Sequence, residues 1–219
     1  MSMLSTFRKP SAEAVRKFLA DQARLDFTYS PVGATAGRPP AGYRLNRTRE
    51  RLGRGRGVFD RAKAALQRWE QFRIGWVEIQ PPDAPVAPGV VLAIVANRLG
   101  LWWLNACRVV YVVDEDDPTA PSARFGAAFG TLPGHVGAGE ERFQVEWDAA
   151  SGEVWYEVAS FSQPHLLLTR LGFPYMRWSQ RVFGRQSAEA MIRAIGGRES
   201  EPVPPECNNP LRDSARPRL

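Results

Sequence analysis

A glycine-rich segment near the middle of the chain, FGTLPGHVGAGEERF at residues 129–143, places a histidine close to two carboxylates. His135 could accept a proton near neutral pH, and Glu140 or Glu141 could orient it or act as an acid, so the segment could perform general acid/base catalysis. The alternative is structural: His135 makes hydrogen bonds within a loop, and the glutamates lie on a solvated turn beside Arg142. Both interpretations stay open at the level of sequence.

Metal chemistry is not expected of this segment. The only other histidine, His165, lies on a different predicted element, and neither Cys107 nor Cys207 is near either histidine in sequence. Zinc sites need three or four such ligands, and two distant cysteines do not make the paired pattern of a disulfide framework. We therefore expect neither a metal nor another cofactor.

A second set of candidate residues lies between Trp102 and Val113, a segment that alternates as a strand but is largely apolar on both faces. Asn105, Arg108 and Tyr111 are its polar members. Polar groups on a strand buried on both sides must hydrogen-bond internally or face a cavity. Polar groups in an apolar concave wall are typical of small-molecule sites. The three polar residues could therefore contact a ligand or make structural hydrogen bonds, and the sequence does not favour either interpretation.

Arginines are concentrated between residues 44 and 56, where six of them accompany a single glutamate in a chain of net charge +6. Three alternating glycines precede a predicted helix, so Arg54 and Arg56 could hold a phosphate or carboxylate. The segment lacks the Lys-Ser/Thr ending of a P-loop, and the structural alternative is a flexible basic turn. Nucleic-acid binding is not favoured, because no aromatic residue between Arg44 and Gly57 could stack on a base. An acidic partner is the other alternative.

The elements that position these candidates follow from hydrophobic periodicity. Steps of three and four predict helices over 11–23 and 58–73. Residues 132–139 are expected to form a turn. A long helix over 166–195 is expected to be kinked or interrupted at Gly172 and Pro174. Short runs of β-branched and aromatic residues predict antiparallel strands over 76–80, 89–96, 102–113, 124–131, 142–147 and 153–161.

Length and composition favour one globular domain, since 219 residues with 44% hydrophobic content can bury a substantial core. We expect an N-terminal helix and lead-in over 1–24, a single α+β domain over 25–196, and a disordered tail over 197–219. No apolar run approaches the roughly 20 residues of a membrane-spanning helix, and the first residues do not resemble a secretory signal. A cytoplasmic location is therefore expected, whereas the oligomeric state is not indicated.

Several long segments carry a family resemblance. They are, in order, TYSPVGAT from Thr28, LGRGRGVFDRAKAALQRW ending at Trp69, NACRVVYVVDE from Asn105, FGTLPGHVGAGEERFQVE from Phe129, and GFPYMRWSQRVFGRQSAEAM ending at Met191. They resemble an uncharacterised family named domain of unknown function nineteen-ninety, which implies no established reaction. The order of elements also resembles the START-like, polyketide-cyclase superfamily. That resemblance implies a helix-grip fold, in which a curved antiparallel sheet packs on a long C-terminal helix and often holds a hydrophobic ligand.

These observations lead to the hypothesis that the protein binds a lipophilic or amphipathic small molecule between the sheet and the C-terminal helix. The predicted apolar walls are Trp103, Tyr111, Phe129, Trp155, Phe183 and Met191. The residues predicted to orient a polar head are Asn105, Arg108, Thr131 and His135. The alternatives are a cofactor-free acid/base enzyme that uses His135 with Glu140 or Glu141, and a basic interaction module.

Overall fold

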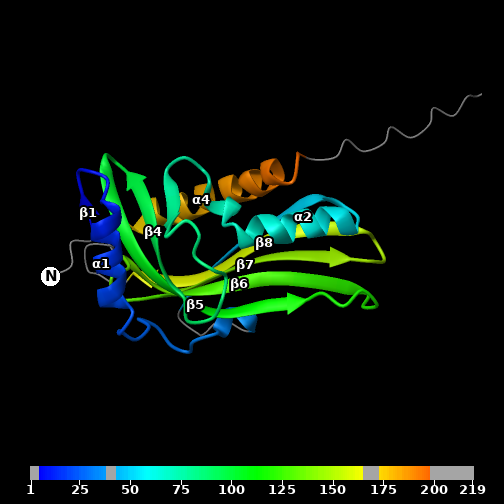
Figure 1. Cartoon of the computed structure of the whole chain (residues 1–219), viewed down its shortest axis with the longest axis horizontal. Coiled ribbons are helices and arrows are strands. Elements are labelled where there is room, and N and C mark those ends of the chain that lie inside the picture. Colours follow the sequence, from blue (N-terminus) through cyan, green and yellow to red (C-terminus); the bar gives the residue numbers. More distant parts are fainter. Residues whose placement is uncertain (1–4, 38–42, 165–172, 198–219) are drawn as a thin grey trace, which may run out of the picture.

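A computed structural model describes residues 5–37, 43–164 and 173–197, in which a curved antiparallel sheet packs against helices (Figure 1). In the sheet the strands lie in the order β2-β8-β7-β6-β5-β4-β3, and β1 pairs with β5. Strands β3 to β8 therefore form a meander, and β2 crosses over to lie beside β8. The strands are β1 (Ser5–Thr6), β2 (Arg44–Arg54), β3 (Val77–Gln80), β4 (Val91–Arg98), β5 (Leu101–Glu115), β6 (Ser122–Thr131), β7 (Gly137–Asp148) and β8 (Glu153–Pro164).

Helices cover both faces of this sheet. Helices α2 and α4 lie over one face, which we call the inner face, whereas η1 lies on the opposite, outer face and α1 crosses one end (Figure 1). Ser11 caps α1, because its side chain accepts a hydrogen bond from the Ala14 amide. The helices are α1 (Ala12–Gln22), α2 (Arg56–Gln67) and α4 (Phe173–Ala194), and the short 3-10 helices are η1 (Ala34–Ala36) and η2 (Glu70–Phe72).

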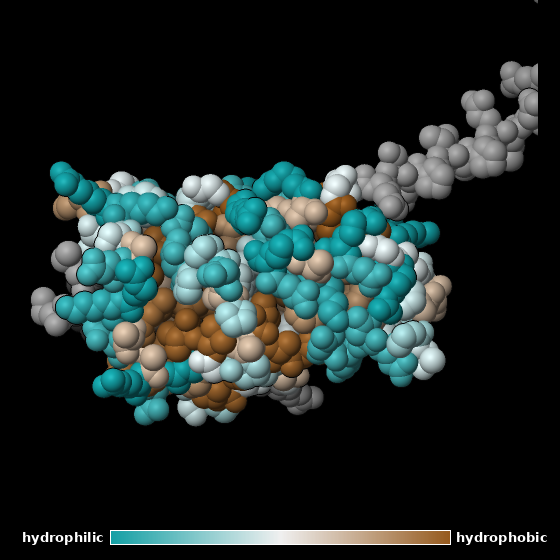
Figure 2. All heavy atoms as spheres, in the orientation of Figure 1, coloured by the Kyte–Doolittle hydropathy of each residue, from teal (hydrophilic) through white to brown (hydrophobic). Residues whose placement is uncertain are grey.

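The main core lies between the inner face and the two helices. On β7, Phe143 and Val145 are fully buried, whereas Arg142 and Glu146 alternate with them and are partly exposed. The inner side chains pack in one cluster with α2 and α4, and each buried phenylalanine or leucine contributes about 1.5–3 kcal/mol. Figure 2 shows hydrophilic side chains over α2 and an apolar area between α1 and α2.

The predicted fold class is confirmed: the protein is α+β, with a curved antiparallel sheet packed on a C-terminal helix. All six predicted strands overlap β3 to β8, because each keeps the alternation of β-branched and aromatic residues. The helix predicted over 11–23 is α1. Among the described residues, no helix is both long enough and apolar enough to cross a bilayer.

The strand β2 was not predicted: residues 44–54 form the edge strand of the sheet, and Gly53, one of the glycines for which a flexible basic turn was the structural alternative, lies within it. Arg47, Arg49 and Arg51 occupy alternate positions and pair with carboxylates of β8 and β7. Arg47 pairs with Glu157 at 2.5 Å, and Arg49 pairs with Glu146 at 3.0 Å. An edge strand can thus carry charged residues on one face when each charge pairs with an opposite charge on another strand of the sheet.

Two other boundaries were also predicted incorrectly. The helix expected over 58–73 ends at Gln67, because Trp69 adopts a left-handed φ of 58° and the chain continues as η2. The turn expected over 132–139 is shorter, because β7 already begins at Gly137.

The described part of the C-terminal helix begins at Phe173, so Pro174 lies in its first turn and not in its interior. Pro174 is the second residue of α4, and the first turn of a helix tolerates proline because its amide groups have no partner within the helix. Gly172 lies outside the described residues, as does the predicted tail beyond residue 197.

Candidate functional site

Two neighbouring carboxylates on β7 point to opposite faces of the sheet. Glu140 lies opposite Phe161 of β8, and Glu141 lies opposite Ser160. Because side chains alternate along a strand, the candidates of one short segment divide into two environments. Glu140 belongs to the outer face, and Glu141 belongs to the inner face.

The Glu140 carboxylate is buried and is saturated with hydrogen bonds. Its Oε2 accepts from the Tyr29 hydroxyl at 2.6 Å and from the Gly33 amide at 2.7 Å. Its Oε1 accepts from the Thr35 amide at 2.9 Å and from the Thr35 hydroxyl. All of these donors lie in or next to the segment that contains η1. Glu140 therefore ties that segment to the outer face, and its bonding is that of a structural carboxylate.

The network around Glu140 extends along the outer face. Burial, together with the hydrogen bond to Glu140, raises the pKa of Tyr29 far above its ordinary value, so the phenol stays a donor. Thr35 shares a hydrogen bond of 2.8 Å with the Tyr111 hydroxyl, and its carbonyl accepts from Arg142 at 3.0 Å. We call these five residues the η1 network.

Glycines allow close contacts throughout the FGTLPGHVGAGEERF segment. A Cβ atom on Gly134 would lie 2.6 Å from the Phe18 ring, and a Cβ atom on Gly139 would overlap the Phe161 carbonyl. The glycine spacing is therefore explained by packing.

On the inner face, Glu141 lines a pocket of about 90 Å³ between the sheet and α4. The Glu141 side chain is partly buried, and its carboxylate has no hydrogen-bond or ion-pair partner among the described residues. The pocket combines apolar and small polar groups. The residues that line it with Glu141 include Ile94, Cys107, Phe129, Thr131, His135, Ser160, Ser162 and Gln180.

Burial raises the pKa of Glu141 to about 7. It also raises the pKa of the Cys107 thiol, to which the nearby Glu141 charge adds. Desolvation penalises the charged form of an acid, and within the described part of the chain no donor offsets that penalty at Glu141. A carboxyl group that titrates near neutral pH inside a pocket is typical of a functional site.

His135 lines the same pocket as Glu141. Its Nδ1 lies 2.9 Å from the Gly137 amide nitrogen and 3.1 Å from the Gly137 carbonyl oxygen, so the ring is held against the first residue of β7. Asn105 supports the same loop, since its Oδ1 accepts from the Val136 amide at 3.4 Å. The structure thus brings Asn105, His135 and Glu141 to one end of the inner face.

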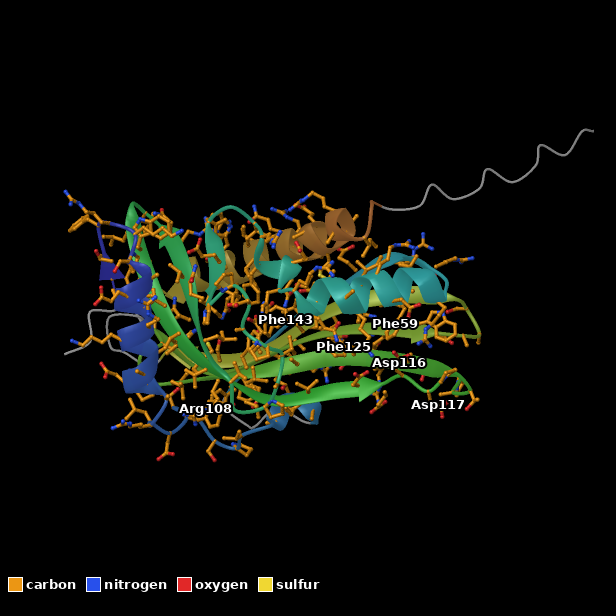
Figure 3. All side chains as sticks on the ribbon, viewed as in Figure 1. Phe59, Arg108, Asp116, Asp117, Phe125 and Phe143 are labelled. Carbon is orange, nitrogen blue, oxygen red and sulfur yellow. The ribbon has the colours of Figure 1, made fainter. Side chains whose placement is uncertain are left out.

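Three predicted ligand-binding residues lie on the outer face. Arg108 donates to two carbonyl oxygens that follow α1, at 2.9 Å each. Figure 3 shows Arg108 and the inner residue Phe143 on opposite sides of the sheet. Tyr111 belongs to the η1 network, and Trp155 lies 5.0 Å from an arginine guanidinium of β2.

The remaining predicted wall residues contribute to the core or to the end of the sheet. Trp69, Phe72, Phe129, Phe143 and Phe183 form an aromatic cluster with neighbouring ring centroids 5.2–6.4 Å apart. This cluster fills much of the space between the sheet and α4. Met191 is fully buried in the same core, and Trp103 lies opposite Ser5 of β1.

The predicted anion site is matched by the protein's own carboxylates. Arg56 pairs with Asp60 at 3.0 Å and with Asp116, and Arg54 lies 3.8 Å from Glu153. An external anion would compete with these groups, and the role of Arg54 and Arg56 stays a prediction.

A second hollow, of about 230 Å³, lies beside α1. Its lining includes Lys9 and Glu78, which form an ion pair of 2.8 Å with each other. Its charges are therefore satisfied, unlike that of Glu141. Within the described ranges, no three His, Cys, Asp or Glu residues are grouped so that they could hold a metal ion.

Sequence reasoning missed Ser160, Ser162 and Gln180 as pocket residues. A signal was present for the two serines, because they continue the inward-facing alternation of Tyr156 and Val158 as small polar residues. Gln180 gave no comparable signal, since its proximity depends on how α4 packs.

Comparison with known proteins identifies relatives of similar length. A family model described as "Domain of unknown function (DUF1990)" matches residues 28–190. A "UPF0548 protein" of Dictyostelium discoideum is 33% identical over 210 residues, which cover 89% of this chain and 97% of that protein. Another, from Deinococcus radiodurans, is 35% identical over 202 residues, which cover 86% of this chain and 98% of that protein.

Solved structures show only a distant similarity. Human STARD10 is 10% identical with a TM-score of 0.41, and the match covers 86% of this chain and 80% of that one. Norcoclaurine synthase from Thalictrum flavum is 7% identical with a TM-score of 0.43, and the match covers 73% of this chain and 97% of that one.

Proposed function

This chain belongs to the family described as a domain of unknown function (DUF1990), and membership of that family assigns no activity. From the geometry of the site, we propose that the Glu141 pocket binds the polar head of a small amphipathic molecule. The observation that carries the proposal is the Glu141 carboxyl group. It lines a pocket, has no partner among the described residues and has a pKa raised to about 7. A ligand that donates a hydrogen bond would remove the cost of leaving this group unpaired.

The pocket wall indicates the chemistry of the ligand. An ammonium or hydroxyl group would face Glu141, with Ser160 and Ser162 close by as further hydrogen-bonding groups. Ile94 and Phe129 would contact the apolar part. The volume of about 90 Å³ is below the roughly 300–1,000 Å³ of sites for drug-sized ligands. We therefore expect the pocket to take a head group or a molecule of a few heavy atoms.

The test uses hexylamine and hexanol, which differ only in the head group, with binding measured by calorimetry and ligand-observed NMR. At pH 8 we expect the wild type to bind hexylamine more tightly than hexanol, and Glu141→Gln to lose at least about tenfold in hexylamine affinity. Because a carboxyl of pKa about 7 is mostly protonated at pH 6, hexylamine binding should weaken about tenfold between pH 8 and pH 6.

Glu146→Gln is the matched control, since it makes the same change on the outer face of the same strand. It should bind hexylamine as the wild type does. Equal hexylamine binding by the wild type and Glu141→Gln would contradict the proposal, as would binding that does not change with pH.

A second candidate function is proton transfer, which is favoured by the presence of His135 and Glu141 in one pocket. A carboxyl with a pKa near the working pH is suited to general acid/base catalysis. Incubation with a cellular metabolite extract, followed by mass spectrometry, should show a compound that the wild type consumes and that Glu141→Gln and His135→Asn do not. If wild type and both variants leave identical extracts, this candidate is wrong.

A further inference from the structure

Three of the most exposed large apolar side chains lie at one end of the molecule. The exposed fractions are 87% for Phe7, 80% for Leu99 and 51% for Trp178. They come from the segment after β1, from the turn between β4 and β5, and from α4. Single exposed apolar side chains are common on folded domains, but exposed apolar side chains gathered in one place commonly mark an interaction surface.

The fold brings these three segments together. Thr6 of β1 pairs with Trp102 near the start of β5, so Phe7 follows directly beside the hairpin. The guanidinium of Arg98, at the end of β4, lies 5.8 Å from the Trp178 ring. Figure 1 shows β1, the β4–β5 hairpin and the start of α4 at the same end of the sheet. We call Phe7, Arg98, Leu99, Trp102 and Trp178 the hairpin tip.

Leu99 occupies a turn position at which leucine is unusual. Arg98 pairs with Leu101, so the turn consists of Leu99 and Gly100 alone, and both have positive φ, 55° and 74°. Such two-residue hairpin turns favour Asn-Gly, because asparagine tolerates the left-handed region and leucine does not. The turn therefore holds an apolar side chain in solvent in a strained backbone conformation. A local rule broken in this way points to function.

Cationic groups surround the tip. Arg98 stacks on the Trp76 ring at 3.4 Å, and its Nε and Nη2 atoms are buried and have no hydrogen-bond partner among the described residues. Arg8, between Phe7 and Lys9, is exposed. Lys9 lies 5.5 Å from the Trp102 ring and is paired with Glu78 at 2.8 Å, so an anionic headgroup would have to compete with that carboxylate. Tryptophan, leucine and phenylalanine flanked by arginine and lysine are the residues found at membrane–water interfaces.

We propose that the hairpin tip docks onto the surface of an anionic lipid bilayer, with Leu99 and Phe7 inserted at the boundary of the acyl chains. The exposed apolar side chains of the tip come from three separate segments, so they suit a soft medium that needs no matching shape. A specific protein partner would instead bury a continuous surface of about 800 Å² on each side. The positive charge favours anionic headgroups. This inference stands on the tip alone and does not depend on a ligand in the Glu141 pocket.

The test is co-sedimentation of the full chain with vesicles of phosphatidylcholine, with and without about 30% phosphatidylserine. We expect the wild type to bind the anionic vesicles more tightly, and the affinity to fall as salt is raised. The double variant Phe7→Ser, Leu99→Asn should lose at least about tenfold in affinity, since each apolar side chain transferred from water is worth roughly tenfold or more.

Leu99→Asn also separates docking from folding. Asparagine suits the turn, so the single variant should match or exceed the wild-type melting temperature while binding the vesicles more weakly. Leu25→Ser is the matched control, because Leu25 is 39% exposed and follows α1, away from β1 and the hairpin. This variant should bind the vesicles as the wild type does.

Three results would overturn the proposal. The first is that the wild type does not bind anionic vesicles. The second is that the wild type and the double variant bind them equally. The third is that the wild type binds no vesicles but self-associates in sedimentation velocity, and that Leu99→Asn abolishes this self-association. The last result would assign the tip to contact between copies of the chain.

Discussion

Glu140 and Glu141 are neighbours in the sequence, yet their carboxylates lie on opposite faces of the sheet and differ in their hydrogen-bond partners. Glu140 receives four hydrogen bonds on the outer face, all from one segment of the chain. Glu141 receives none from the described residues on the inner face, where burial raises its pKa to about 7. The difference teaches that the role of a charged residue on a strand is set by the face it occupies. One carboxylate ties the η1 segment to the sheet, and the other is the group that we propose a ligand contacts.

The largest effect is expected from removing the outer carboxylate. Glu140→Gln should lower the free energy of unfolding by about 3 kcal/mol, because an amide NH₂ would replace one acceptor oxygen and face backbone and hydroxyl donors. Urea denaturation at neutral pH measures this value. Glu146→Gln, on the same face with its side chain 27% exposed, should cost less than about 1 kcal/mol. Equal losses in the two variants would remove the distinction between the η1 network and ordinary surface pairs.

A smaller effect of opposite sign is expected at the inner carboxylate. Since the pKa of Glu141 is raised in the folded state, its charged form destabilises the fold, and stability is lost as pH rises from about 4.3, the ordinary value, through about 7. Glu141→Gln should therefore gain about 1–2 kcal/mol at pH 8, a value reduced because the group is partly exposed to solvent. Near pH 4 the variant and the wild type should be equally stable. A loss of stability at pH 8 would show that Glu141 is a structural carboxylate like Glu140.

The fold was predictable from sequence because most of its strands carry a strong alternation. The inward and outward residues of β7 were assigned correctly from Phe143 onward. The first residues of that strand were missed because Gly137 and Gly139 disfavour strands, and the two glutamates were therefore assigned to a turn. Without the strand, their division between two faces could not be seen.

The partners of the two glutamates could not be predicted, for a physical reason. Tyr29 and Thr35 reach Glu140 from more than a hundred residues away, and no local pattern records a contact of that kind. The strand β2 was missed for a related reason. Its arginines lower its apparent strand character, and only the register with β8 shows that Arg47 has a carboxylate beside it.

Glu141 lines a pocket without a partner among the residues that the structure describes, and the titration of its own carboxyl group tests this most directly. Carbon-13 NMR of the side-chain carboxyl, assigned by its disappearance in Glu141→Gln, gives the midpoint in the unliganded wild type. We predict a midpoint near pH 7. A midpoint close to the ordinary value of about 4.3 would mean that the carboxylate is solvated or paired, and would contradict the account.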